Sequence, residues 1–196
     1  YDLIKNLRGG ITASYWNTMG KLFGHSIKDG YVPGEDRILD AVLEILRGGA
    51  LPPRALARST AVFETLARAE AAVHGTKTEE VHFHEVGAVD SIVDIVGGVI
   101  ALRWLAADRF VSSPLNVGSG TVKMDHGTFP VPPPATARLV SGVPVYGAGE
   151  GELLTPTGAL LVTAHATEYG PLPPMTIEAT GCGAGSREIA GRPNVL

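Results

Sequence analysis

The stretch VHFHEVGAVDSIVDIVGG, residues 81–98, decides the fold and holds the densest group of chemically active side chains. Apolar and polar residues alternate over residues 81–84, a pattern typical of a short strand. Because successive side chains of a strand point to opposite faces, we expect His82 and His84 to share one face. After Gly87 the apolar residues recur with a helical period, so we predict a helix from about residue 88 to about residue 107.

Acidic residues accompany the two histidines. Asp90 and Asp94 are four residues apart, so the predicted helix places them on one face. An apolar helix with two carboxylates, next to two imidazoles and Glu85, is costly unless partners satisfy these polar groups. Imidazole and carboxylate suit nickel, zinc, iron or manganese, so we interpret His82, His84 and Glu85 as metal ligands.

A structural explanation stays open for each of these residues. Neighbouring histidines are often ordinary surface residues, and Asp90 could simply cap the helix start, where anions are favoured. The spacing is neither that of a zinc finger nor the HExxH helix of metalloproteases. We favour a functional site because all five polar side chains fall in one short stretch.

Composition describes a globular chain. Its 196 residues, 44% hydrophobic and 18% charged, are enough for one large domain or two small ones. The net charge of −4, with no long basic run, gives no reason to expect nucleic acid as a partner. The single cysteine, Cys182, excludes an intramolecular disulfide and predicts a cytoplasmic location.

Targeting and membrane signals are not found in this sequence. The longest apolar segment, residues 92–107, is interrupted by Asp94 and Arg103 and is too short to span a bilayer. No stretch resembles a signal peptide, so we expect no membrane association. The chain begins with Tyr1 rather than Met, so we expect it to be a fragment or a trimmed chain.

The pattern before and after the central stretch predicts an α+β fold. Residues 35–47 and residues 53–74 predict two packing helices, whereas residues 1–34 form an irregular N-terminal segment without clear periodicity. Glycine and proline cluster after residue 113, which is typical of short strands and shaped loops. We therefore expect residues 35–196 to form a single domain, a mixed sheet of short strands with flanking helices. The strands expected in the second half are residues 109–112, 115–117, 121–124, 143–146 and 175–180, with helices from about Pro134 and Pro156.

The helix expected to begin at Pro156 offers an anion site. Thr155 is suited to the N-cap and proline to the first helical position. The free amides of the helix start, with Thr155, Thr157 and Gly158, predict a phosphate cradle, although threonine-proline is also a routine helix start.

Glycine-rich turns supply the other candidates for ligand binding. In the turn of residues 181–187, Gly183 and Gly185 would let the backbone approach a ligand, and Arg187 could bind phosphate. Ser119, between Gly118 and Gly120, is a further candidate. These turns match neither GxGxxG nor a P-loop. Together the motifs predict a site for a phosphorylated small molecule and a metal ion.

Four motifs resemble the nickel-insertion protein (LarC) family. They are HFHEVGAVDSIVDIVG, GSGTVKMDHGTFPVPPPAT, GELLTPTGA and GCGAGSRE followed by RPNVL, and they occur in the family's order over about residues 35–196. The resemblance implies a lyase, a cyclometallase that inserts nickel into pyridinium-3,5-bisthiocarboxylic acid mononucleotide. The product is the nickel-pincer nucleotide cofactor of lactate racemase, with one nickel–carbon and two nickel–sulfur bonds. The reaction consumes CTP with manganese or magnesium.

The resemblance also suggests roles and partners. His82, His84 and Glu85 would hold nickel before its transfer to sulfur, while Asp90 and Asp94 would orient the imidazoles or accept the proton lost from the ring carbon. His126 is a lesser candidate for base or ligand. The mononucleotide would be the substrate, and the CTP-handling C-terminal part of the family would lie beyond Leu196; a homo-oligomer is also compatible with the resemblance. The family's opening motif, DxxxGxSGDM, is not found in residues 1–34.

Two alternative functions stay open. A non-catalytic, nickel-binding scaffold half would present the metal to a partner domain without any covalent change. A metal-dependent phosphohydrolase or transferase would use the same ligands to activate water.

Overall fold

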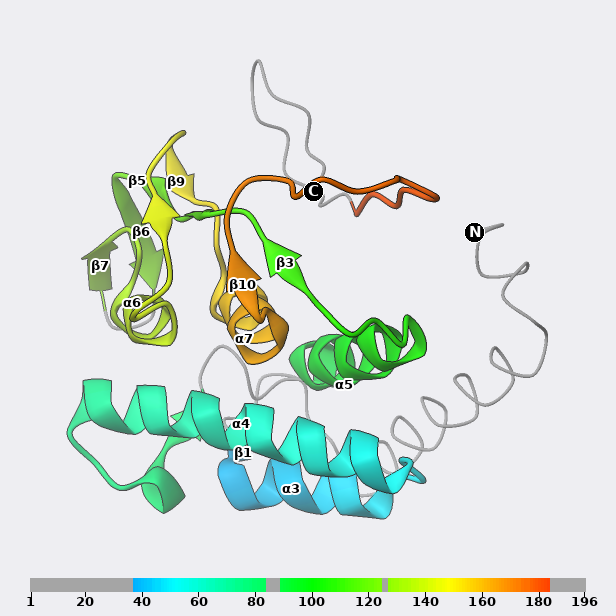
Figure 1. Ribbon diagram of the computed structural model, residues 1–196. Helices are drawn as coiled ribbons and strands as arrows, with labels where there is room; N and C mark the ends of the chain where they lie inside the picture. The colour runs from blue at the N-terminus through cyan, green and yellow to red at the C-terminus, as the bar shows by residue number, and fades with distance from the viewer. Residues whose placement is uncertain (1–36, 84–88, 125–126, 184–196) are drawn as a thin grey trace.

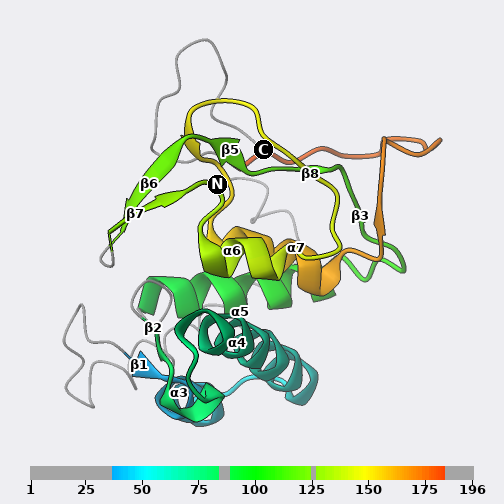
Figure 2. The same ribbon diagram turned by 90° about the vertical axis from the view of Figure 1, so that its left-hand side faces the viewer.

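The computed structural model describes residues 37–83, 89–124 and 127–183 (Figure 1). Helix α4 is central, because it contacts α3, α5, α6 and α7. In both views the short strands of residues 115–130 and 145–152 lie on the far side of α6 and α7 from α3 and α4, whereas the strands of residues 37–38 and 82–83 lie beside α3 (Figures 1 and 2). The helices are α3 (Leu39–Gly48), α4 (Pro53–His74), the 3-10 helix η1 (Thr78–Glu80), α5 (Val89–Trp104), α6 (Pro134–Leu139) and α7 (Pro156–His165).

The boundaries of α4 follow from its sequence. Pro53 occupies the first turn, and Gly75 ends the helix in the left-handed conformation, with φ of 66°. This confirms the predicted second packing helix. The first packing helix begins at Leu39 rather than at residue 35, because Arg37 and Ile38 form strand β1. Strand β1 pairs antiparallel with β2 (His82–Phe83), which binds this backbone to the central stretch.

One hydrophobic core joins the helices. The helical layer, which we define as α3, α4 and α5, supplies most of its fully buried side chains, and α7 closes it from above. Burial of such large apolar side chains is the main favourable contribution to folding. The largest fully buried apolar side chains include Val42, Leu46, Phe63, Leu66, Ile95, Val96 and Leu160.

The α+β class is confirmed, and the strands are distributed differently from the expected single sheet. The described strands form five two-stranded sheets, of which β3–β10 and β4–β8 are parallel and the others antiparallel. Each described strand has two to four residues, so none is long enough to organise a continuous sheet. The remaining bounds are β3 (Val111–Ser112), β4 (Leu115–Asn116), β5 (Gly118–Ser119), β6 (Thr121–Met124), β7 (Gly127–Pro130), β8 (Val145–Tyr146), β9 (Gly151–Glu152) and β10 (Glu168–Tyr169).

The strand predicted at residues 175–180 is wrong. These residues form no strand, and their side chains are exposed, including Met175 and Ile177 at 59% each. A strand requires a partner for its backbone groups, and the described residues provide none here. Among the described helices, none combines the length and apolar character required to cross a membrane.

Candidate functional site

Strand β2 places the first histidine of the central stretch on the surface. Val81 and Phe83 are only 1% and 2% exposed, whereas His82 between them is exposed. His82 lies opposite Ile38 of β1, and Phe83 opposite Arg37. The predicted alternation is therefore confirmed for residues 81–83. His84 and Glu85 lie outside the described residues, as does His126.

Helix α5 presents Asp94 to solvent. Ile92, Ile95 and Val96 face the core, so Asp94 lies on the opposite, outer side of the helix. Asp90 belongs to the first turn of the same helix, but its side chain lies outside the described part. Within the described part, no three His, Cys, Asp or Glu side chains come together as a metal site. The assignment of His82, His84 and Glu85 as nickel ligands therefore stays a prediction.

The start of α7 is capped as its sequence predicts. Thr155 is the N-cap, and its hydroxyl oxygen accepts a hydrogen bond of 3.2 Å from the Gly158 amide. Pro156 occupies the first helical position and has no amide hydrogen. The cap therefore engages the Gly158 amide, one of the donors that the predicted phosphate cradle would use. The binding roles of Thr155, half-buried Thr157 and Gly158 remain predictions.

Asn116 and Ser119 hold two loops together. The Asn116 amide nitrogen donates to the Ala148 carbonyl at 2.9 Å, and its oxygen accepts from the amides of Gly118 and Ala148 at 3.1 and 3.0 Å. The Ser119 hydroxyl donates to the Gly149 carbonyl at 2.7 Å. Ser119 is a predicted ligand-binding residue, and its hydroxyl thus stabilises the loop that carries Gly149. Its ligand-binding role stays a prediction.

The glycine-rich turn after residue 180 is only partly described. Gly183 is exposed and follows an extended, exposed segment, and Cys182 beside it is an exposed free thiol. Gly185 and Arg187 lie outside the described residues. The ligand-binding role of Gly183, Gly185 and Arg187 therefore stays a prediction.

Sequence reasoning missed a cavity between α4, α5 and α7. It has a volume of about 330 Å³, and Arg54 and Arg58 reach it from successive turns of α4. Arg103 reaches it from the last turn of α5, and His165 from the last turn of α7. The four-residue spacing of Arg54 and Arg58 indicates that both lie on one face of α4. Only the packing of α5 against α4 adds Arg103 to the same cavity. The other lining residues are Val99, Leu102, Ala106, Ala107 and Phe110.

Hydrogen bonds fix two polar side chains of this cavity. The Arg58 guanidinium donates to the Ala164 carbonyl, and the Nδ1 atom of His165 lies 2.8 Å from the Leu161 carbonyl oxygen. Burial lowers the pKa of His165 below its ordinary value of 6.5, the positive charge of Arg58 acts in the same direction, and the bond to Leu161 opposes them. His165 is therefore neutral near pH 7, with Nδ1–H as the donor to Leu161.

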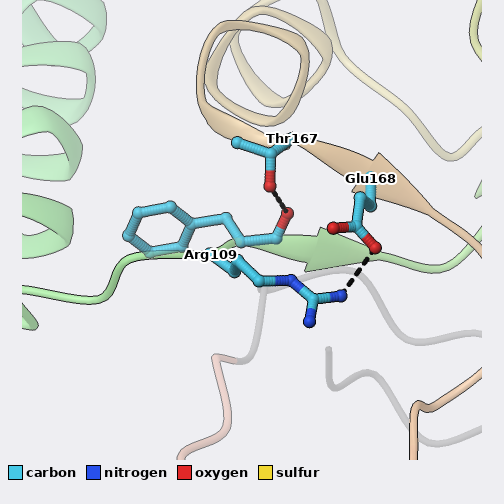
Figure 3. A network of polar contacts seen from close by, with 4 residues as sticks. Arg109, Thr167 and Glu168 are labelled. Carbon is cyan, nitrogen blue, oxygen red and sulfur yellow. Dashed lines mark hydrogen bonds and ion pairs between the residues drawn. The ribbon is translucent and has the colours of Figure 1, made fainter.

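A polar network holds the wall that carries Phe110 (Figure 3). The amide and the hydroxyl of Thr167 both donate to the Phe110 carbonyl, at 2.9 and 3.1 Å. Next to it, the Arg109 guanidinium and the Glu168 carboxylate form an ion pair of 2.6 Å. These contacts join the segment that enters β3 to the segment that enters β10, and so position Phe110 at the cavity.

Comparison with known proteins identifies the family. A family model described as nickel insertion protein matches residues 3–196, and this match extends into residues 1–34, where the family's opening motif is not found. The pyridinium-3,5-bisthiocarboxylic acid mononucleotide nickel insertion protein of Desulfitobacterium hafniense is 49% identical over 161 residues, 82% of this chain and 40% of that protein. The protein of the same description from a Nocardioides species is 55% identical over 136 residues, 69% of this chain and 35% of that protein.

Other relatives carry a similar description. A putative nickel insertion protein of Geobacter sulfurreducens is 54% identical over 136 residues, 69% of this chain and 35% of that protein. This chain thus spans about two fifths of the length of the curated relatives it matches. No solved structure matches it. Because the family model and these relatives cover most of its length, the chain belongs to the nickel insertion protein family.

Proposed function

We propose that this chain takes part in inserting nickel into pyridinium-3,5-bisthiocarboxylic acid mononucleotide. The observation that carries this proposal is the identity of about half the residues, over most of the chain, to proteins described by that reaction. Nickel and the mononucleotide are both substrates. In this proposal the protein is a cyclometallase of the lyase class that acts in the cytoplasm, and its product is the nickel-pincer cofactor of lactate racemase.

The reaction sets clear demands on the protein. Nickel(II) must be held by donors that later release it to the two thiocarboxylate sulfurs, and imidazole and carboxylate are suitable donors. The nickel–carbon bond replaces a carbon–hydrogen bond, so a base must accept the proton while nickel keeps its oxidation state. We assign nickel to His82, His84 and Glu85, and the orienting or proton-accepting role to Asp90, Asp94 and, as a lesser candidate, His126.

The described residues support this assignment in one respect. His82 is exposed while its neighbours in sequence are buried, and Asp94 is exposed on α5, so both side chains are accessible to a substrate from solvent. We assign the CTP-dependent step, with magnesium or manganese, to a C-terminal part of the family outside this chain, in keeping with the greater length of its relatives.

Nickel titration by calorimetry tests the metal role. His82→Ala combined with His84→Ala should weaken nickel binding at least about tenfold, because loss of imidazole ligands removes metal–nitrogen bonds. His74→Ala is the control, since it removes an exposed histidine at the end of α4. Equal nickel affinity in the double variant and the unmodified protein would eliminate this motif as the nickel site.

The reaction itself is tested by mass spectrometry. The protein, together with the C-terminal part to which we assign the CTP-dependent step, is mixed with nickel and the mononucleotide, with and without CTP, and the expected product has gained nickel and lost the displaced protons. Nickel binding without this product would favour the scaffold alternative. Release of phosphate from simple esters would favour the phosphohydrolase.

A further inference from the structure

A separate concave site lies at the C-terminal end of α5. Its volume of about 330 Å³ is near the lower end of the range for small-molecule sites, roughly 300–1,000 Å³. From Val89, where α5 begins, to Arg103 at the cavity, the helix rises by about 21 Å at 1.5 Å per residue. The cavity is therefore distinct from the start of α5, which the proposed nickel ligands precede in the sequence.

The cavity is basic although the whole chain is acidic. Arg54, Arg58 and Arg103 line it together with His165, and none of its lining residues is acidic, whereas the chain has a net charge of −4. Arg54 and Arg103 form no ion pair with any residue that the structure describes. Guanidinium groups bind phosphate through two parallel hydrogen bonds, so this cluster fits a phosphate better than a neutral ligand.

The rest of the lining is apolar and includes an aromatic ring. Val99, Leu102 and Phe110 belong to this lining, and the bonds from Thr167 to the Phe110 carbonyl fix the backbone of Phe110. A planar ring packs favourably against an aromatic side chain, and a positively charged ring gains additional attraction from the aromatic face. The lining thus suits a molecule that has both a phosphate and a planar, cationic ring.

We infer that this cavity binds a pyridinium mononucleotide, with its phosphate on the arginines and its ring against Phe110. The choice of ring rests on the proposed function, since a pyridinium mononucleotide appears in the description of several relatives. The cavity is then a docking position for this substrate, apart from the proposed nickel ligands at the other end of α5.

Binding measurements on charge variants test this inference. The probe is nicotinic acid mononucleotide, which has a pyridinium ring, a carboxylate and a phosphate. Arg54→Gln combined with Arg103→Gln should weaken its binding at least about tenfold, because charge-assisted hydrogen bonds are lost. Arg47→Gln with Arg138→Gln is the control, since it removes the same charge from exposed positions outside the cavity. Equal thermal midpoints of the two double variants show that both are folded.

A second variant tests the contact with the ring. Phe110→Leu should weaken binding of the mononucleotide about three- to tenfold and leave binding of ribose 5-phosphate unchanged, because only the former has a ring to stack. Equal losses for both probes would overturn the placement of the ring. Cytidine triphosphate and inorganic phosphate complete the set, and tighter binding of either to the unmodified protein would overturn the choice of a pyridinium mononucleotide.

The outcomes separate this inference from the proposed function. Unaltered mononucleotide affinity in the variant of Arg54 and Arg103 overturns the cavity as the binding site, even if the protein forms the nickel product. Absence of nickel product in the mixture that includes the C-terminal part and CTP, with mononucleotide binding that depends on these arginines, would overturn the insertion reaction and keep the cavity as a nucleotide site.

Discussion

The helical layer and the loops around Asn116 are stabilised in different ways. In α3, α4 and α5, apolar side chains fill a common core, and backbone hydrogen bonds lie within each helix. Around Asn116, strands of two residues are held by side chain-to-backbone bonds and by close backbone contacts. We call this second region, residues 115–120 and 145–153, the loop layer. We therefore expect the stability of the helical layer to depend mainly on buried side-chain volume, and that of the loop layer on backbone conformation.

The largest effect on stability is expected from a substitution that disrupts the packing of the helical layer. Phe63 on α4 is 0% exposed, so Phe63→Ala should lower the free energy of unfolding by about 3–5 kcal/mol through lost burial and a cavity. Val73→Ala on the same helix, where the side chain is 36% exposed, should cost less than about 1 kcal/mol. Urea unfolding measures both, and equal losses would contradict a core centred on α4.

The next largest effect on stability is expected from a substitution that disrupts the close contact between Gly118 and Gly151 in the loop layer. Gly118 has φ of 87°, and a Cβ atom there would lie 1.9 Å from the Gly151 carbonyl oxygen. Gly118→Ala should therefore cost about 2–4 kcal/mol, from left-handed strain plus the displacement of a backbone segment.

Gly120 provides the matched control for that contact. It has a similar φ of 84°, but a Cβ atom added there would meet no other atom within 4 Å, so Gly120→Ala should cost only the strain, about 1–2 kcal/mol. The difference between the two variants isolates the contact with Gly151. Identical unfolding energies would mean that strain alone requires glycine at both positions.

A smaller effect on stability is expected at the start of α7. There a side chain-to-backbone hydrogen bond, as in the loop layer, supports a helix that packs against the helical layer. Thr155→Ala removes the cap on the Gly158 amide and should cost about 1 kcal/mol. Thr155→Ser retains the hydroxyl and should stay close to the unmodified protein. If the alanine variant nevertheless bound the mononucleotide as tightly as before, Thr155 would have a capping role only.

The smallest effect is a pH dependence at His165. Because its folded-state pKa lies below 6.5, the unfolded chain takes up the proton first as pH falls. The stability that neutral His165 contributes is complete above about pH 6.5 and decreases as pH falls toward the folded-state pKa. His165→Gln should show less loss of unfolding energy between about pH 7.5 and about pH 5 than the unmodified protein. Parallel curves for the two would contradict the lowered pKa.

Local signals were sufficient for several elements. Pro53 and Gly75 set the ends of α4, Thr155 and Pro156 set the start of α7, and residues 81–83 alternate as predicted. Each of these depends on neighbours in sequence, because caps, prolines and side-chain alternation act over a few residues. Strand β1 and the segment at residues 175–180 depend on whether a distant partner is present, so the local pattern predicted them wrongly.

The candidate sites also differ in whether they depend on sequence neighbours or on residues distant in the chain. The sequence alone determined the family motifs, the strand that exposes His82 and the cap at Thr155, because each lies within one continuous stretch. Only the tertiary structure decided the basic cavity, since Arg54, Arg103 and His165 come from three helices far apart in the chain. Packing of α5 and α7 against α4 brings these side chains to one cavity, and no local sequence pattern encodes contacts between residues so far apart in the chain.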